Sequence, residues 1–434
     1  MDETTREDYR WLISEKAEPL LTETMTALMN RVNSVRLIKA LRQQTSVNRA
    51  ALLLEQAQLR IRGRQKFSLA DQMFFTRRGL EQATGEPLAQ YKARRFSQMK
   101  SVADICCGIG GDLMGLVNRQ LDQPATSDEG STNTTDPRQS RSTFHSVGVD
   151  ADELTGWFAS HNASIANSLS DSATGVVRVQ RSEYATFDRN GFDAIHCDPD
   201  RRVERRTILA QHFSPPLDQL LREISREVPL GIKLAPATVL EPSDCREIER
   251  EWIGDRRECK QQLLWRGSIT DKPGWRTATA VIAHDAHQFS VLEESLFAEL
   301  PQTGKLQRFL YEPHPTILAA EMTDAFAAQL GLARIAEGIG YLTGAQLVHH
   351  PLLSSFEVIE VLEMSFKKTL QCLRSYDVGT IELKRRGISP AMAAAFEKMK
   401  LSGSRQATVF LTRLDRQRIV VVAQRRGGAL AGGD

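Results

Sequence analysis

The sequence predicts an α/β protein whose doubly wound, mostly parallel sheet follows a helical region and precedes a smaller α+β domain. In residues 1–97 the apolar residues recur at helical spacing, without strong alternating runs. In residues 98–300 short apolar runs alternate with helical stretches, which is typical of a parallel sheet. Residues 305–426 add further helices and late strands, so we expect three regions.

The composition is that of an ordinary soluble protein. The chain has 434 residues, 41% of them hydrophobic and 25% charged, which suffices for two or three domains with proper cores. The formal net charge is only +2, so a basic surface must come from local clustering. No apolar run is long enough to span a membrane, and we expect no membrane partner.

The six cysteines indicate reduced thiols and no metal centre. None of them has C-x-x-C spacing, and no His-x-x-x-His run accompanies them. The first residues are charged and do not form the apolar core of a secretory signal. These features predict a cytoplasmic protein.

The helical region is basic in its middle. Apolar residues there recur at intervals of three and four, and cations lie among them. Two interpretations stay open, a solvated helix face and a surface that contacts RNA. The cations are Arg49, Arg60, Arg62, Arg64 and Lys66.

Five short apolar runs predict the strands of the central sheet. They end in acidic or glycine-rich turns, where parallel sheets bind ligands. Polar residues dominate 121–142, which we interpret as a disordered insertion, and the tail 427–434 is also expected to be disordered. The predicted strands are 101–105, 146–149, 176–179, 192–197 and 230–234.

The turn after the first strand is the main sign of function. Gly108 and Gly110 fit the dinucleotide pattern G-x-G-x-x-G, but the third glycine position is Leu113. Glycines let the backbone approach a ligand, and free N–H groups at the following helix favour a polar or anionic group. An acidic residue before a neutral loop suits the methionine ammonium of S-adenosylmethionine (SAM), although an ordinary turn is the alternative. The predicted contacts are Asp104, Cys106, Gly108, Gly110, Gly111 and Asp112.

Acidic residues after the next two strands extend this cofactor site. Asp150 ends the second strand, where a carboxylate can accept hydrogen bonds from both ribose hydroxyls. NAD enzymes share that feature, so Asp150 alone does not discriminate between cofactors. Ser182 or Glu183, after the third strand, is placed to contact the adenine amine.

The fourth strand ends in Asp198-Pro199-Asp200-Arg201-Arg202, which predicts the site of methyl transfer. A D-P-x segment lies beside the sulfonium methyl in SAM enzymes that modify amines of bases. Pro199 fixes φ, while Asp198 can accept hydrogen bonds from an exocyclic amine and aim its lone pair. Positioning then supplies most of the rate. We therefore predict Asp198, Pro199 and Arg201 as catalytic residues, with a turn proline as the alternative.

Cations near this segment are candidates for substrate binding. Arg202 and its neighbours can clamp phosphates or stack on a base, and they can equally be surface charge. Lys233, after the fifth strand, either lines the substrate side or forms a structural salt bridge.

These motifs resemble bacterial class I SAM-dependent methyltransferases with a C-terminal THUMP-like domain, from about residue 50 to residue 426. The nucleotide-binding half is also similar to the RNA cap guanine-N2 methyltransferases, the trimethylguanosine synthases, through residues 107–111. The motifs that carry the resemblance are 74–84, 104–112, 198–202, 311–313, 384–387 and 407–412.

The resemblance implies a Rossmann-like fold and an RNA substrate. It also implies that Glu81, Gln82 and Thr84 pack over the cofactor, where the residues alone predict only a helix end. In the C-terminal domain, basic groups that include Lys384 and Arg385 are compatible with phosphate contacts or with a solvated face.

The chain departs from those families in two respects. The guanine-N2 enzymes carry a second proline and an aromatic residue where this sequence has Asp200 and Arg201, so the usual stacking partner is missing. The THUMP-like domain follows the catalytic domain, whereas it precedes that domain in well-known THUMP enzymes. The accepting nitrogen and the presentation of RNA are therefore left open.

The leading hypothesis is a SAM-dependent methyltransferase that modifies an exocyclic or ring nitrogen of an RNA base. A SAM enzyme acting on a protein or a small acidic metabolite is the second hypothesis. A non-catalytic RNA-binding module with a vestigial SAM fold is a distant third. Leu113 and the Asp-Pro after strand four disfavour a nicotinamide dehydrogenase.

Overall fold

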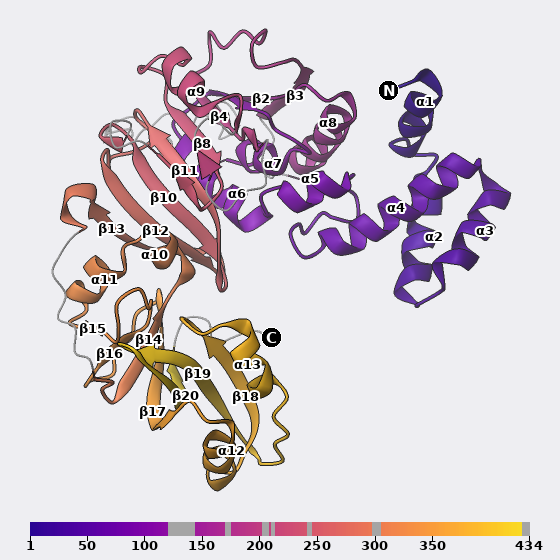
Figure 1. The fold of residues 1–434 in the computed structure, drawn as a ribbon. Coiled ribbons are helices and arrows are strands. Elements are labelled where there is room, and N and C mark those ends of the chain that lie inside the picture. Colours follow the sequence, from indigo (N-terminus) through magenta and orange to yellow (C-terminus); the bar gives the residue numbers. More distant parts are fainter. Residues whose placement is uncertain are drawn as a thin grey trace, which may run out of the picture. The chain divides into compact units, whose positions relative to one another are not determined.

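The computed structural model describes residues 1–119, 144–169, 175–201, 208–209, 213–240, 245–296 and 305–427. The chain divides into two compact units (Figure 1). The first comprises Met1–Leu234, Thr238–Leu240 and Leu264–Asp271, and the second comprises Ala235–Ala237, Glu241–Leu263 and Lys272–Asp434. The insertion predicted at 121–142 lies outside the described residues.

The N-terminal region is helical, as predicted. Asp2, Asn33, Ser46 and Thr76 each begin a helix by accepting a hydrogen bond from a free backbone N–H of its first turn. The elements are α1 (Glu3–Leu12), α2 (Glu18–Met29), α3 (Ser34–Gln44), α4 (Val47–Gly63), α5 (Arg77–Gln82), α6 (Glu86–Ala93) and the 3₁₀ turn η1 (Arg94–Phe96).

These helices share a core with the cofactor-binding part of the first unit. Phe74 stacks on Phe158, and both are buried among apolar residues of the helical region. Asn162, which is fully buried, accepts a hydrogen bond from the N–H of Phe74 and donates to the carbonyl oxygens of Phe74 and Ile109. The chain after α4 is thereby tied to the glycine-rich turn.

The sheet of the first unit confirms the predicted Rossmann-like class. Its order is β3-β2-β1-β4-β8 with every pair parallel, so the strand order reverses between β1 and β4. Ligands bind at such a reversal, beyond the carboxyl ends of the strands. The strands are β1 (Ser101–Ile105), β2 (Phe144–Asp150), β3 (Gly175–Arg181), β4 (Ala194–Cys197) and β8 (Leu230–Leu234), with helices α7 (Gly111–Val117), α8 (Glu153–Ser168) and α9 (Leu217–Glu223).

Short strand pairs complete the first unit. The segment after β4 forms β5 (Asp200–Arg201), which pairs with β7 (Phe213–Ser214). Strand β6 (Ile208–Leu209) pairs with β9 (Thr238–Val239).

The second unit contains two groups of strands. Strand β10 (Glu249–Asp255) is parallel to β12 (Trp275–Ile282), which is antiparallel to β13 (Asp285–Leu292). Strand β11 (Glu258–Arg266) begins in this unit and ends in the first, and the 3₁₀ turn η4 (Glu293–Ser295) follows β13.

A seven-stranded sheet forms the rest of the second unit, in the order β15-β16-β14-β17-β20-β19-β18. It confirms the late strands that the sequence predicted. The strands are β14 (Phe309–Pro313), β15 (Ala333–Arg334), β16 (Leu342–Gly344), β17 (Leu353–Glu363), β18 (Val378–Arg385), β19 (Arg405–Leu414) and β20 (Gln417–Gly427), with helices α10 (Pro315–Ala319), α11 (Thr323–Gln329), α12 (Phe366–Ser375) and α13 (Pro390–Glu397).

Local backbone geometry sets the limits of several elements. Two helices lie in residues 315–329, because Glu321 adopts a left-handed φ of 57° between them. Gly427, expected to start the disordered tail, ends β20, and 428–434 lies outside the described residues. Helix α7 begins at Gly111. Among the helices described, none has the length and apolarity needed to cross a membrane.

Candidate active site

The glycine-rich turn runs from the end of β1 to the start of α7. Cys106, Gly108 and Gly110 have positive φ values of 59°, 56° and 86°. A Cβ at Gly108 would meet no heavy atom within 4 Å, whereas one at Gly111 would lie 2.9 Å from the carbonyl oxygen of Thr84. Gly108 therefore borders open space that a ligand can enter, and Gly111 permits close packing of the chain before α6.

Asp150 connects the glycine-rich turn to the end of β2. Its Oδ2 accepts a hydrogen bond from the N–H of Gly108 at 3.0 Å, and its Oδ1 accepts one from Asp152 at 2.9 Å. Burial raises the pKa of this half-exposed carboxyl, and the two N–H donors oppose that rise. The residue predicted to bind ribose therefore also fixes the turn.

Asp104 is fully buried at the end of β1 and pairs with a histidine of β4. Its Oδ1 lies 2.6 Å from Nδ1 of His196, and the two residues are register partners in the parallel sheet. Neither Asp104 Oδ2 nor His196 Nε2 has a hydrogen-bond partner among the described residues. Burial raises the pKa of Asp104, and the charge and hydrogen bond of His196 counteract this.

Asp112 forms a buried ion pair behind the glycine-rich turn. Its Oδ1 lies 2.5 Å from Nζ of Lys92, and its Oδ2 accepts a hydrogen bond from the hydroxyl of Thr84 at 2.7 Å. Burial acts to raise the pKa of Asp112, but the cations around it, Lys92 first, hold the pKa below its usual range. The carboxylate is therefore ionised and links α6 and α7.

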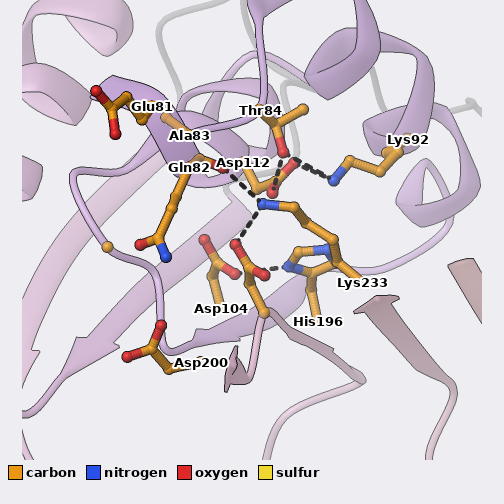
Figure 2. A network of polar contacts seen from close by, with 12 residues as sticks. Glu81, Gln82, Ala83, Thr84, Lys92, Asp104, Asp112, His196, Asp200 and Lys233 are labelled. Carbon is orange, nitrogen blue, oxygen red and sulfur yellow. Dashed lines mark hydrogen bonds and ion pairs between the residues drawn. The ribbon is translucent and has the colours of Figure 1, made fainter. Parts of the chain in front are cut away.

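Asp198, the predicted acceptor of the substrate amine, is held by Lys233 of β8. Nζ of Lys233 lies 2.5 Å from Asp198 Oδ2 and donates to the carbonyl oxygen of Gln82 at 3.1 Å (Figure 2). Burial opposes the charge of Lys233, but the carboxylates of Asp198 and Asp112 raise its pKa above the usual value. Lys233 is thus a cation that joins the ends of β4 and β8 to the end of α5.

The segment 77–84 is held against the site at several points. Nζ of Lys66 donates to the carbonyl oxygens of Leu80, Glu81 and Ala83, which lie at the end of α5. A Cβ at Gly79 would lie 2.5 Å from Cγ2 of Ile109, so only glycine allows this approach to the glycine-rich turn. This segment therefore lies next to the glycine-rich turn, and its predicted packing over the cofactor stays a prediction.

The remaining predicted residues of the first unit have varied surroundings. Pro199 is buried, and Glu183 is exposed after β3. Glu81 is exposed and pairs with Arg62 at 3.7 Å, and Figure 2 shows its side chain outside the bonded network. The backbone of Arg201 belongs to β5, but its side chain and all of Arg202 lie outside the described residues.

The predicted RNA contacts of the second unit include one cation that is already paired. Nζ of Lys384 lies 2.6 Å from Oε2 of Glu312, and both side chains are largely buried. Arg385, the next residue, is exposed. Only Arg385 of these two is therefore free to reach a phosphate without breaking an ion pair.

Sequence reasoning did not assign a role to Lys92 or His196. His196 could have been found, because it occupies the same register as Asp104 on the neighbouring parallel strand, and residues in register share a face. Lys92 carries no comparable signal, since only the packing of α6 against α7 brings it to Asp112.

The arrangement fits SAM in two respects. Asp104 Oδ2 is an acceptor without a partner among the described residues, suited to the methionine ammonium or to a water that bridges to it. Gly108 leaves open space at the turn, and one carboxylate oxygen of Asp150 beside it already orders the loop. Among the residues described, no cluster of histidine, cysteine or carboxylate side chains could hold a metal ion.

Comparison with known proteins gives three findings. Residues 353–425 match the family described as THUMP domain-like. Uncharacterized SAM-dependent methyltransferases from two strains of Mycobacterium tuberculosis are 27% identical over 347 residues, covering 79% of this chain and 85% of theirs. A crystal structure of a candidate methyltransferase from Porphyromonas gingivalis W83 superposes with a TM-score of 0.69 at 18% identity, covering 88% of this chain and 92% of that one.

These findings confirm the class that the sequence predicted. The fold is that of a class I methyltransferase with an N-terminal helical region and a C-terminal THUMP-like domain. The protein is a SAM-dependent methyltransferase, and the predicted cofactor is confirmed with it. The closer resemblance to guanine-N2 enzymes stays a prediction.

Proposed function

We propose that this methyltransferase transfers the methyl group of SAM to a nitrogen of an RNA base, with Asp198 as the residue that accepts a hydrogen bond from that nitrogen. The observation that carries the proposal is the state of Asp198. Lys233 holds its Oδ2, while the side chain remains 31% exposed at the carboxyl end of β4. An exposed, oriented carboxylate at this place suits an amine donor.

Lys233 determines what Asp198 can do. Lys233 holds Oδ2 of Asp198 and leaves the partly exposed carboxylate able to accept a hydrogen bond, so we assign Asp198 the role of hydrogen-bond acceptor and not of the group that removes the proton. SAM supplies an activated methyl group, which makes strong acid–base catalysis unnecessary. Asp198 orients the nitrogen, and buried Pro199 restricts the backbone beside it.

Support for RNA comes from outside the transfer site. Residues 353–425 match a THUMP-like family, and THUMP-like domains are expected to contact RNA by the resemblance that the sequence carries. The predicted cytoplasmic location also suits an RNA substrate. The alternative, an acidic metabolite or protein bound by the arginines after Asp198, depends on side chains outside the described residues.

Replacing Asp198 tests the assignment. We expect Asp198→Ala to lower methyl incorporation into total bacterial RNA by at least about 100-fold, because the amine loses its positioning group. The assay uses purified full-length protein, methyl-labelled SAM and RNA digested to nucleosides for mass spectrometry. Calorimetry should show SAM affinity within a few-fold of the original.

Asp200→Ala is the matched control. Asp200 is an exposed carboxylate two residues away that binds Arg78 at 2.7 Å, so its loss should change transfer only slightly. An Asp198→Ala variant that still methylates RNA at the original rate contradicts the role of Asp198. Label that appears in protein or metabolite fractions, and not in RNA, contradicts the choice of substrate.

A further inference from the structure

Helix α3 carries a continuous row of exposed cations. Arg36, Lys39 and Arg42 lie three residues apart, so they occupy successive turns along one side of the helix, with neighbouring side chains about 5–6 Å apart. All three side chains are exposed. Arg31, in the turn before α3, is also exposed and adds a fourth cation.

No acidic residue balances these cations. The sequence from Thr24 to Leu54 contains no aspartate or glutamate. Within the described part of the chain, Arg31, Arg36, Lys39 and Arg42 form no ion pair. Four uncompensated charges on one short segment give a strong local positive potential, although the net charge of the whole chain is only +2.

The basic residues that the sequence first suggested for RNA behave differently. Arg49 pairs with Asp8 at 2.7 Å, and Arg60 is fully buried against Glu18. Arg64 pairs with Asp71 at 2.7 Å. Lys66 is occupied by three carbonyl oxygens. These four cations are paired or hydrogen-bonded within the helical region, whereas the cations of α3 form no ion pair among the described residues.

We propose that the side of α3 formed by Arg31, Arg36, Lys39 and Arg42, the α3 surface, binds the phosphate backbone of the RNA substrate. The inference rests on the proposed function for the identity of the polyanion. Lysine and arginine release counterions from a phosphate backbone on binding, which needs cations in a row and no base-specific pocket. Phosphate contacts of this kind position the nucleic acid, while the site of transfer selects the nucleotide.

The apolar residues of the α3 surface argue against an anionic membrane. Its exposed large apolar residues are Val32 and Val35, whereas helices that lie in a membrane interface present tryptophan, phenylalanine or leucine. Leu41 is buried, because the side of α3 that carries it packs against α2 and α4 (Figure 1). Exposed Gln43 and Gln44 add hydrogen-bond donors suited to phosphate or sugar oxygens.

The test compares two triple variants of the full-length protein. The first, Arg36→Gln/Lys39→Gln/Arg42→Gln, removes the cations of α3 with a residue that favours helices. The control, Lys16→Gln/Lys100→Gln/Arg178→Gln, removes three exposed cations from elsewhere in the first unit. Binding of a labelled mixed-sequence single-stranded RNA oligonucleotide is followed by fluorescence anisotropy across a potassium chloride series, and circular dichroism checks folding.

We expect the α3 variant to bind at least several-fold more weakly, and its slope of log K against log salt to be shallower by about 2, since each lost phosphate contact removes about 0.7. The control variant should keep the original slope. Across an RNA concentration series that approaches saturation, methyl transfer by the α3 variant should show a raised KM for RNA and an unchanged kcat.

Several outcomes overturn the inference. They are an original protein that does not bind the oligonucleotide, an α3 variant with the original affinity and slope, and a control variant that weakens equally. Vesicles containing phosphatidylserine form a further arm, and α3-dependent binding to vesicles with unchanged RNA binding also overturns it. If RNA binds through α3 but receives no methyl group, the proposed function fails and the inference about α3 stands.

Discussion

Two lysine–aspartate ion pairs of the first unit have the same N···O distance and very different surroundings. In each pair the lysine Nζ lies 2.5 Å from a carboxylate oxygen. The side chains of Lys92 and Asp112 are 3% and 7% exposed, whereas those of Lys233 and Asp198 are 11% and 31% exposed. Charges in the interior are weakly screened, so an unpaired partner costs more in the first pair than in the second.

The comparison separates a structural pair from one that, as we propose, faces the substrate. The Lys92–Asp112 pair joins α6 to α7, two helices so close that a Cβ at Gly115 would lie 2.6 Å from the carbonyl oxygen of Ala89. The Lys233–Asp198 pair leaves its carboxylate partly open at the end of β4. The same chemistry therefore serves stability in one place and, as we propose, substrate positioning in the other.

The largest effect is expected from breaking the buried pair. Lys92→Met leaves the Asp112 carboxylate without its cation in the interior, which should lower the free energy of unfolding by about 3–5 kcal/mol. Urea denaturation followed by circular dichroism measures this loss.

A double variant provides the control. Lys92→Met/Asp112→Leu removes both charges and should recover most of the lost stability, because apolar residues replace the pair without leaving a charge behind. A single variant that loses less than about 1 kcal/mol contradicts a buried structural role for Lys92.

Breaking the partly exposed pair of Lys233 and Asp198 should instead affect activity more than stability. Lys233→Met lets Asp198 regain solvent, so the free energy of unfolding should fall by only about 1 kcal/mol. The carboxylate loses its orientation, and kcat for methyl transfer should fall about 10-fold to 100-fold.

The conservative substitution sharpens this result. Lys233→Arg keeps a cation beside Asp198 and should restore part of the lost kcat. Thermal denaturation of the same variants separates a loss of kcat from a loss of stability. A Lys233→Met variant with unchanged kcat would show that the Lys233–Asp198 pair is structural, like the Lys92–Asp112 pair.

Much of the fold was predictable because its strands are continuous apolar runs. Strands β1 and β8 have the predicted bounds. Strand β4 begins at Ala194 and not at 192, because the side chain and N–H of Asp193 are used in hydrogen bonds to Ser101. Local polar contacts of this kind are invisible in an apolar pattern.

The site was predictable only along the sheet. Asp104, Asp150 and Asp198 lie at or next to strand ends, where the sequence pattern points. Lys92 comes from a helix, and its role depends on tertiary packing that no spacing encodes. The same reason explains why the sequence could not separate buried from exposed cations in the helical region. Arg60 and Arg36 look alike in the sequence, but the fold buries Arg60 beside Glu18 and leaves Arg36 exposed.

The smallest expected effect is the pH dependence of the buried pair. The pKa of Asp112 is held below its ordinary value of 3.8, so the folded state binds that proton more weakly than the unfolded state does. The stabilisation is therefore complete above the ordinary pKa and is lost as the pH falls below it. Lys92→Met/Asp112→Leu lacks this group, and it is the reference because it keeps every other carboxyl.

The measured quantity is the free energy of unfolding of the original protein minus that of the double variant. This difference should be constant from pH 7 to pH 5 and about 0.3 kcal/mol smaller at pH 4. That decrease is what proton linkage gives for one carboxyl whose pKa is 3.8 in the unfolded state and lower in the folded state. Asp104, whose pKa is raised first by burial, is present in both proteins. A difference that grows as the pH falls would show that burial, and not the cation of Lys92, controls Asp112, and it would remove the contrast between the two pairs.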